Sequence, residues 1–221
     1  METKEWRHTD KSGYGPGEWQ DEPDKVQWVD EATGLPCLIV RGPVGALCGY
    51  VGVHASHPWF AVSYSSCSNK IPCEESYCDH VPSNYVQVHG GLTYSNFCMD
   101  STREQWEAFR KRINSPEHLA EVAKYPRGDA AQYEQRMRPF VDDFEGWLRQ
   151  REARSICHLP GPGEPDRVWW FGFDCAHYGD IAPSLREFGL GSLTYGGESY
   201  KNIRYVKDQV ASLARQLAEH R

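Results

Sequence analysis

The sequence predicts an α+β protein with a mainly antiparallel sheet, covered by a helical insertion and a C-terminal amphipathic helix. Short apolar runs joined by glycine-containing turns fill the first part of the chain, as in a strand meander. Segments with helical spacing follow, and then one more strand and one more helix. We divide the chain into a polar N-terminal arm, residues 1–25, and a single α+β domain, residues 26–221, with a helical insertion at 101–152.

The first strands follow the arm. Residues 1–25 are polar, acidic and rich in glycine, so we expect a loosely structured arm. Strands are predicted at 26–29 and 38–40, on either side of a turn that contains Gly34, and a third strand is predicted at 45–53. These three strands form the predicted meander.

A further strand is predicted from Tyr85, because apolar and polar residues alternate there. Val86 and Val88 share one face and Gln87 and His89 share the other, so this strand should end near residues 90–91.

Helices are predicted from capping residues and apolar spacing. Ser101 with Glu104 has the capping-box pattern, and Ser115 precedes a proline suited to a first helical position. Pro139 predicts a kink or break in the third helix. The last helix has one apolar stripe, which should lie across the sheet. The predicted helices span about 101–113, 116–124, 129–151 and 199–219.

The strand that begins at Trp169 ends in polar, reactive residues. Phe171 and Phe173 should share one face of this strand, and Trp170 and Asp174 the other. Cys175 also follows this strand, and we interpret it as a small buried residue rather than a nucleophile.

Histidines stand at three predicted strand ends, and this pattern suggests a shared site. If these ends meet at one edge of the sheet, the imidazoles and Asp174 could bind a divalent metal or act as acid and base in phosphodiester cleavage. Alternatively, each histidine is a satisfied residue of the core or its rim. The candidate catalytic residues are His89, Asp174 and His177, and the candidate ligand-binding residues are His54, His57, Gly90, Gly91, Tyr94 and Trp170.

A second candidate metal site lies in a Ser/Cys-rich loop. Cys67, Cys73, Cys78 and His80 could hold zinc in a tetrahedral arrangement. Their spacing matches no short Cys-x-x-Cys pair, so separate thiols packed in a loop are the alternative.

Composition and charge limit the binding partners and the cellular compartment that we expect for this protein. The net charge of −7 should repel a phosphate backbone, so we expect no extended nucleic-acid partner, although a small anion could bind locally. No apolar run has the length of a membrane span, and residues 1–7 lack the apolar segment of a signal peptide. We therefore expect a cytoplasmic protein without membrane contact, whose cysteines are thiols or metal ligands. The oligomeric state stays open.

Several blocks of the sequence resemble a family of uncharacterised small proteins found in bacteriophage and prophage genomes. The most specific are His-Gly-Gly-Leu-Thr at 89–93 and Gly-Phe-Asp-Cys-Ala-His at 172–177, with weaker similarity at 49–53, 67–78 and 200–217. The resemblance implies no site residues. It implies a setting, since phage accessory proteins of this kind include proteins that cleave or sequester the nucleotide signals of host defence.

Residues and resemblance together predict a phage-type accessory protein that acts on a nucleotide-sized phosphorylated ligand in the host cytoplasm. We expect a small hydrolase or phosphodiesterase with a His/Asp site, with zinc or another divalent metal as the possible cofactor. The alternative is a protein that binds and sequesters the nucleotide signal without turnover, using aromatic faces such as Tyr94 and Trp170.

Overall fold

The chain forms two compact units in a computed structural model that describes residues 3–68, 80–98, 103–126, 128–163, 167–188 and 198–220. One unit comprises residues 1–98 and 154–221, and it holds the sheet and the C-terminal helix. The other comprises residues 99–153 and is helical.

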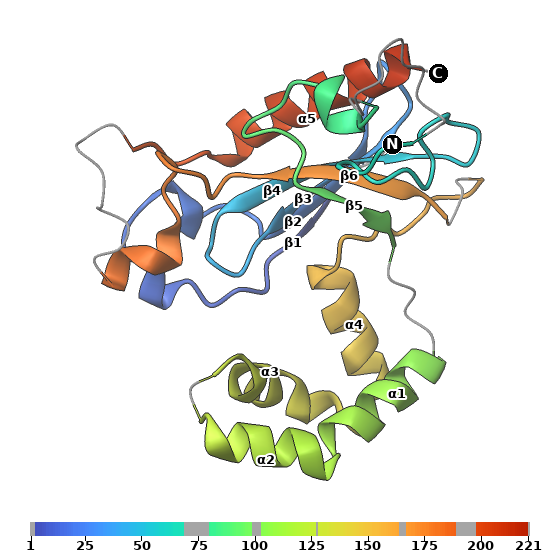
Figure 1. Ribbon diagram of the computed structural model, residues 1–221. Coiled ribbons are helices and arrows are strands. Elements are labelled where there is room, and N and C mark those ends of the chain that lie inside the picture. The colour runs from blue at the N-terminus through green and yellow to red at the C-terminus, as the bar shows by residue number, and fades with distance from the viewer. Residues whose placement is uncertain are drawn as a thin grey trace. The chain divides into compact units, whose positions relative to one another are not determined.

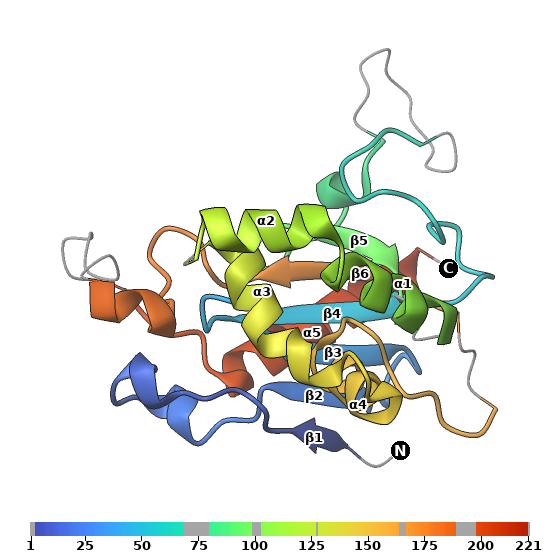
Figure 2. The same ribbon diagram turned by 90° about the horizontal axis from the view of Figure 1, so that it is seen from below.

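The described residues include six strands in one sheet, in the order β1-β2-β3-β4-β6-β5, with antiparallel pairing throughout (Figure 2). The predicted α+β fold and antiparallel sheet are thus confirmed. The strands are β1 (Lys4–Trp6), β2 (Lys25–Val29), β3 (Pro36–Arg41), β4 (Leu47–Val53), β5 (Tyr94–Phe97) and β6 (Trp169–Asp174).

The meander β2-β3-β4 forms as predicted, because local chemistry fixes its first turn. The side chain of Asp30 accepts hydrogen bonds from the backbone and hydroxyl of Thr33 at 3.0 and 2.7 Å. Gly34 follows with φ 71°, a left-handed conformation that glycine adopts at low cost.

Helix α5 (Ile203–Glu219) covers one face of the sheet (Figure 1). Its apolar stripe packs with Phe171 and Phe173, whereas Trp170 lies in a second apolar cluster on the other face, so the predicted faces of β6 are confirmed. Close approach of α5 requires Gly49 of β4, because a Cβ atom there would lie 2.6 Å from Val210. The buried residues of the stripe are Val206, Val210, Leu213, Ala214 and Leu217.

The helical unit has its own apolar cluster, built around Trp106, Ile113 and Trp147. Ser115 accepts a hydrogen bond from the backbone of His118 at 3.1 Å, as its predicted capping role requires. The predicted break at Pro139 is also confirmed, because α3 gives way there to a short 3₁₀ helix. Ser101 lies outside the described residues. The helices are α1 (Arg103–Ile113), α2 (Pro116–Lys124), α3 (Asp129–Met137) and α4 (Phe144–Arg154).

Short 3₁₀ helices complete the secondary structure of the described residues. They are η1 (Ser12–Tyr14), η2 (Glu18–Gln20), η3 (Pro82–Asn84), η4 (Arg138–Phe140) and η5 (Pro183–Phe188). None of the helices in the described part of the chain combines the length and the apolar run that crossing a bilayer would need.

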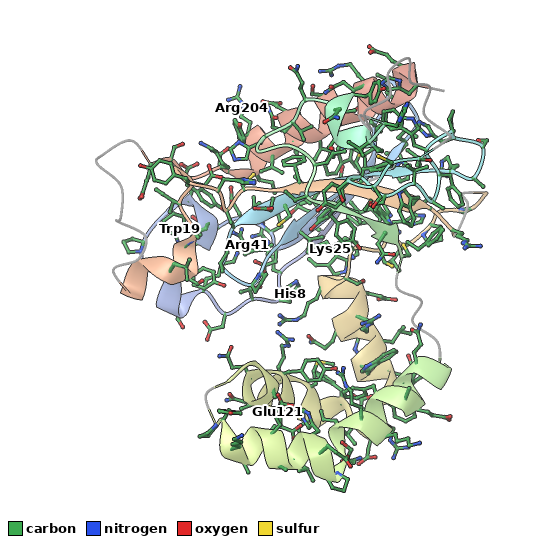
Figure 3. The ribbon with its side chains drawn as sticks, viewed as in Figure 1. His8, Trp19, Lys25, Arg41, Glu121 and Arg204 are labelled. Carbon is green, nitrogen blue, oxygen red and sulfur yellow. The ribbon has the colours of Figure 1, made fainter. Side chains whose placement is uncertain are left out.

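The N-terminal arm is ordered against the sheet, unlike the loosely structured arm we expected. β1 extends the sheet by pairing with β2, and Trp19 is buried against Tyr200 with ring centroids 5.1 Å apart. The physical reason is a buried ionic network that composition alone does not show. Arg41 of β3 lies 2.9 Å from Asp24 and 3.2 Å from Glu22 (Figure 3).

This network also fixes the start of α5. Glu22 accepts a hydrogen bond from the backbone N–H of Ile203 at 2.7 Å and another from the Tyr200 hydroxyl at 2.5 Å. A carboxylate at this position satisfies an otherwise unpaired N–H and interacts favourably with the helix dipole. Arg41 in turn donates to the Tyr200 hydroxyl at 2.9 Å.

We predict that Asp24→Asn lowers the free energy of unfolding by about 3 kcal/mol, because the charges of Arg41 and Lys11 stay buried without their shared partner. Burial raises the pKa of Asp24, but the backbone N–H groups of Thr9 and His8 and the Lys11 ammonium outweigh it and lower the pKa from 3.8 to about 2. Because the folded pKa is the lower one, this stabilisation is present above about pH 4 and is lost as the pH falls towards 2.

Urea unfolding of both proteins between pH 2 and pH 7 measures this effect. The wild type should lose about 2 kcal/mol more than Asp24→Asn across pH 4 to 2. Glu5→Gln is the control, because Glu5 pairs with Arg7 at an exposed position and should change stability by less than about 0.5 kcal/mol. Equal effects of the two substitutions would contradict the prediction.

Candidate functional site

The candidate site begins where β6 ends, in the turn from His177 to Asp180. The backbone N–H of Asp180 donates to the carbonyl of His177 at 2.9 Å, and the Asp180 carboxylate accepts from the N–H of His177 at 3.0 Å. Gly179 has φ 88° within this turn. Two hydrogen bonds between His177 and Asp180 therefore close the turn. The turn places the Asp180 carboxylate beside the His177 ring.

His89 reaches the site from a segment that we predicted as a strand but that lies outside the sheet. Gln216 of α5 takes the place of a neighbouring strand: its side chain accepts from the N–H of Gln87 at 2.7 Å and donates to the Gln87 carbonyl at 2.9 Å. Gln209 accepts from the N–H of His89 at 2.9 Å. The predicted alternation of apolar and polar residues agrees with the burial of Val86, which packs in the core. The backbone of this segment, however, forms its hydrogen bonds with side chains of α5 instead of with a neighbouring strand.

A buried carboxylate joins the two histidines. The Asp180 Oδ2 atom lies 2.7 Å from His89 Nε2, and the Asp180 side chain is only 3% exposed. His89 Nδ1 lies 2.9 Å from the Tyr205 hydroxyl. In the simplest assignment of these bonds, His89 donates from Nε2 to Asp180 and accepts at Nδ1 from Tyr205. Burial, with the charges of Cys175 and Asp180, raises the pKa of Tyr205, so its hydroxyl keeps the proton that it donates.

His177 has an unused nitrogen. Its ring centroid lies 5.6 Å from that of His89, and its Nδ1 lies 3.7 Å from Asp180 and 3.8 Å from Asp174. These separations exceed a hydrogen bond, and the buried Nδ1 atom has no hydrogen-bond partner. Because the His177 side chain is 34% exposed, this imidazole is the member of the cluster that a ligand can reach.

Gly90 provides the space for the His177 ring. A Cβ atom on Gly90 would lie 2.1 Å from His177 Cε1, and the residue has φ 65°. Gly91 has φ 84°, but a Cβ atom there would meet nothing within 4 Å. Only Gly90 of this pair is therefore required by close packing in the site.

Lys201 adds a positive charge. Its Nζ atom lies 3.5 Å from Asp180 Oδ1, on the side of the carboxylate away from His89. Asp180 is thus shared between a histidine, a backbone N–H and a lysine, and these contacts offset the cost of burying its charge.

The cluster of His89, His177 and Asp180 could hold a metal ion, since one ligand atom from each lies within 4.8 Å of the others. Two imidazoles and a carboxylate are a common donor set for a catalytic divalent metal. In a tetrahedral site, ligand atoms about 2.1 Å from zinc are about 3.4 Å apart, so His89 and Asp180 would have to separate slightly. The metal would then replace the proton that these two residues share.

The structure brings together some of the predicted site residues. His89 and His177 are neighbours, and Asp174 lies at the edge of the cluster, 3.8 Å from His177. Asp180 holds the central position that we assigned to Asp174, because the turn after β6 points it back towards both rings.

His54 and His57 lie at the other end of the sheet, because β4 and β6 are antiparallel. The end of β4 at Val53 pairs with the start of β6 at Trp169 rather than with its end at Asp174. His57 is structural: its Nδ1 accepts from the N–H of Trp59 at 3.0 Å, and its Nε2 lies 2.9 Å from the Leu217 carbonyl.

The two predicted stacking residues lie on the face of the sheet opposite α5. Trp170 is fully buried, and its indole N–H donates to Cys98 at 3.1 Å. Tyr94 packs edge-to-face against Tyr50 with ring centroids 5.4 Å apart. These rings serve the second apolar cluster, so neither is part of the histidine site.

The predicted zinc loop falls largely outside the described residues, which exclude Cys73 and Cys78. Cys67 is disulfide-bonded, so it is not the free thiol that we expected and it offers no thiolate to zinc. The His80 carbonyl accepts a hydrogen bond from the N–H of Ser68 at 3.2 Å. Cys175 is buried as predicted, and burial raises the pKa of its thiol.

Sequence reasoning missed Asp180, Lys201 and Tyr205. The spacing of Asp180, directly after Gly179 in a turn that begins at His177, was a usable local signal. Lys201 and Tyr205 have no such signal, because only tertiary contacts bring them to the site: Ser199 forms a β-bridge with Asp180, and Tyr205 lies in the first turn of α5.

Comparisons with known proteins yield no match to a family model, to a curated protein or to a solved structure. The resemblance to phage proteins therefore stays a prediction, and the site must be judged from its own geometry.

We predict that Gly90→Ala and Gly91→Ala have different effects on the site. Both substitutions place a side chain at positive φ, which should cost about 1–2 kcal/mol of stability. Gly90→Ala should also displace His177, and NMR signals of the His177 ring protons should shift in this variant alone. Unchanged His177 signals in Gly90→Ala would contradict the packing described here.

A second prediction concerns metal. In titration calorimetry with Zn²⁺, the wild type should bind one equivalent, and Asp180→Asn and His177→Ala should each weaken binding at least about tenfold. His118→Ala is the control, because His118 forms a comparable pair with Glu134 at 3.0 Å in the helical unit. Equal zinc affinity in all four proteins would place the metal elsewhere.

Proposed function

We propose that this protein is a small hydrolase that cleaves phosphoester bonds in nucleotide-sized ligands, with the cluster of His89, His177 and Asp180 as its active site. The observation that supports this most is the pairing of two imidazoles across one buried carboxylate, with one ring fixed on both nitrogens and the other able to meet a ligand. Such an arrangement can transfer protons near neutral pH, because imidazole titrates in that range.

His177 is the proposed proton-transfer residue, because its ring is partly exposed to a ligand, while its buried Nδ1 atom, which has no hydrogen-bond partner, lies near the carboxylates of Asp180 and Asp174. Asp180 stabilises the positive charge that His177 carries after it accepts a proton, at a separation of 3.7 Å. Both nitrogens of His89 are engaged, by Tyr205 and by Asp180, so His89 holds the Asp180 carboxylate in position beside His177. Asp174 lies beside His177 and adds a second negative charge to its surroundings.

Local positive charge supports a phosphorylated substrate. The protein has a net charge of −7, so an anionic ligand needs local positive charge, and Lys201 could provide it. The open space at Gly91, where a Cβ atom would meet nothing within 4 Å, could admit a phosphate beside this cluster. If a divalent metal binds, His89, His177 and Asp180 would hold it, and it would polarise a phosphoryl oxygen.

A separate observation favours a second candidate function. Both nitrogens of His89 are engaged, which leaves His177 as the one imidazole of the cluster with an unpartnered nitrogen. Metal-free phosphodiester cleavage commonly needs both a base and an acid. The alternative is therefore a protein that binds and sequesters a nucleotide signal without turning it over. In either case, the proposed setting is a phage-encoded protein in the host cytoplasm.

A panel of cyclic dinucleotides and ADP-ribose derivatives, each tested with and without divalent metal, distinguishes these functions. We predict that one class is hydrolysed and that His177→Asn lowers kcat at least about 100-fold while ligand affinity changes little. His118→Asn, in the His118–Glu134 pair of the helical unit, should keep full activity.

The other outcomes are also informative. Tight retention of one compound without turnover would favour sequestration and contradict the hydrolase proposal. If no compound is hydrolysed, retained or able to raise the thermal midpoint, both proposals are wrong, and a role in protein interaction without a small ligand becomes the better hypothesis.

A further inference from the structure

Two cysteines stand where the chain leaves and rejoins the sheet unit. Cys98 is the last residue of the first segment of that unit, directly after β5. The second segment begins at Arg154, and Cys157 follows three residues later. The whole helical unit, residues 99–153, therefore lies between these two thiols in the sequence.

Hydrogen-bond donors surround the Cys98 sulfur. The indole N–H of Trp170 donates to it at 3.1 Å, and His158 Nδ1 lies 3.8 Å from it. The Cys157 thiol is a further hydrogen-bond partner. Trp170 is fully buried and His158 is only 6% exposed, so packing fixes these two donors around the sulfur.

The segment that carries Cys157 is fixed to β2. The buried Lys25 ammonium donates to the Cys157 carbonyl at 2.7 Å. The Gln27 side chain forms two hydrogen bonds with the backbone of Leu159. It donates to the Leu159 carbonyl and accepts from the Leu159 N–H, each at 2.8 Å. Residues of the sheet therefore hold the segment that carries Cys157.

These contacts favour a thiolate at Cys98. The hydrogen bond from Cys157 has the largest effect, burial opposes it, and His158 and Trp170 add to it, so the pKa of Cys98 falls from 9.0 to about 4. Cys48 provides a contrast, because it is also half-buried but burial raises its pKa to about 11. A low pKa and partial exposure are the two features that make a cysteine reactive.

We propose that Cys98 and Cys157 form a peroxide-responsive thiol pair, in which Cys98 reacts with a hydroperoxide and Cys157 resolves the product as a disulfide. The Cys98 thiolate attacks the O–O bond, becomes a sulfenic acid and releases an alkoxide or hydroxide that takes up a proton from water. The Cys157 thiol then attacks the sulfenic sulfur, and its proton leaves with the hydroxyl group as water. Two thiols are oxidised and one peroxide is reduced.

The disulfide would link the two ends of the helical unit. It would join residues 98 and 157 across the base of the insertion and so restrict the unfolded chain over that whole length. Oxidation of this pair would thereby close a covalent loop that contains the whole helical unit. This proposal is independent of the histidine site and of the hydrolase function.

The test uses the full chain, reduced and then freed of reductant. Hydrogen peroxide at a few equivalents, followed by peptide mass spectrometry, should show the Cys98 and Cys157 peptides joined, two hydrogens lighter than the separate thiol peptides. In Cys157→Ser, a cyclic 1,3-diketone should instead trap a sulfenic acid on Cys98.

A second test measures how fast iodoacetamide alkylates each cysteine of the native wild type, so it needs no substitution. At pH 6, Cys98 should react at least about 100-fold faster than Cys48, because Cys98 is a thiolate and Cys48 a thiol at that pH. Equal rates at the two cysteines, or a peroxide product without the link between Cys98 and Cys157, would overturn the proposal.

Discussion

The fold depends on the buried positive charge of Arg41. Arg41 lies in a central part of the sheet unit with a fully buried side chain, and two carboxylates from the N-terminal arm neutralise it. A buried guanidinium without partners would cost several kcal/mol, so the arm must order itself for the strand to form. Glu22 extends this constraint to α5 by accepting from the N–H of Ile203. The arm, the sheet and the start of the last helix are therefore one electrostatic unit.

The position of α5 in turn decides the candidate site. This helix supplies the glutamines that replace a neighbouring strand for Gln87 and His89, and it supplies the Tyr205 hydroxyl that holds the His89 ring. The turn after β6 supplies Asp180 and His177. Because these parts come from three distant segments, the site should be sensitive to any change that shifts α5 along the sheet, including changes in the distant arm.

The histidine cluster and the thiol pair lie at opposite ends of β6. The cluster of His89, His177 and Asp180 lies beyond the end of β6, in contact with residues of α5. The thiol pair lies by the start of the same strand on its other face, where Trp170 contacts Cys98. Antiparallel pairing and the alternation of side chains along β6 keep the two sites apart, so each can be tested by substitution without disturbing the other.

Short-range patterns in the sequence determined most of the secondary structure. Alternation assigned Phe171 and Trp170 to opposite faces of β6, helical spacing predicted the buried stripe of α5, and Ser115 and Pro139 marked a helix start and a helix break. The sequence also suggested that His89 and His177 belong together, from polar residues beside glycines after apolar runs. Only the tertiary structure excluded His54 and His57, gave Asp180 the central place expected of Asp174, and ordered the arm. Periodicity and capping act over a few residues, whereas strand direction, buried ion pairs and side-chain contacts join residues that lie far apart in the chain.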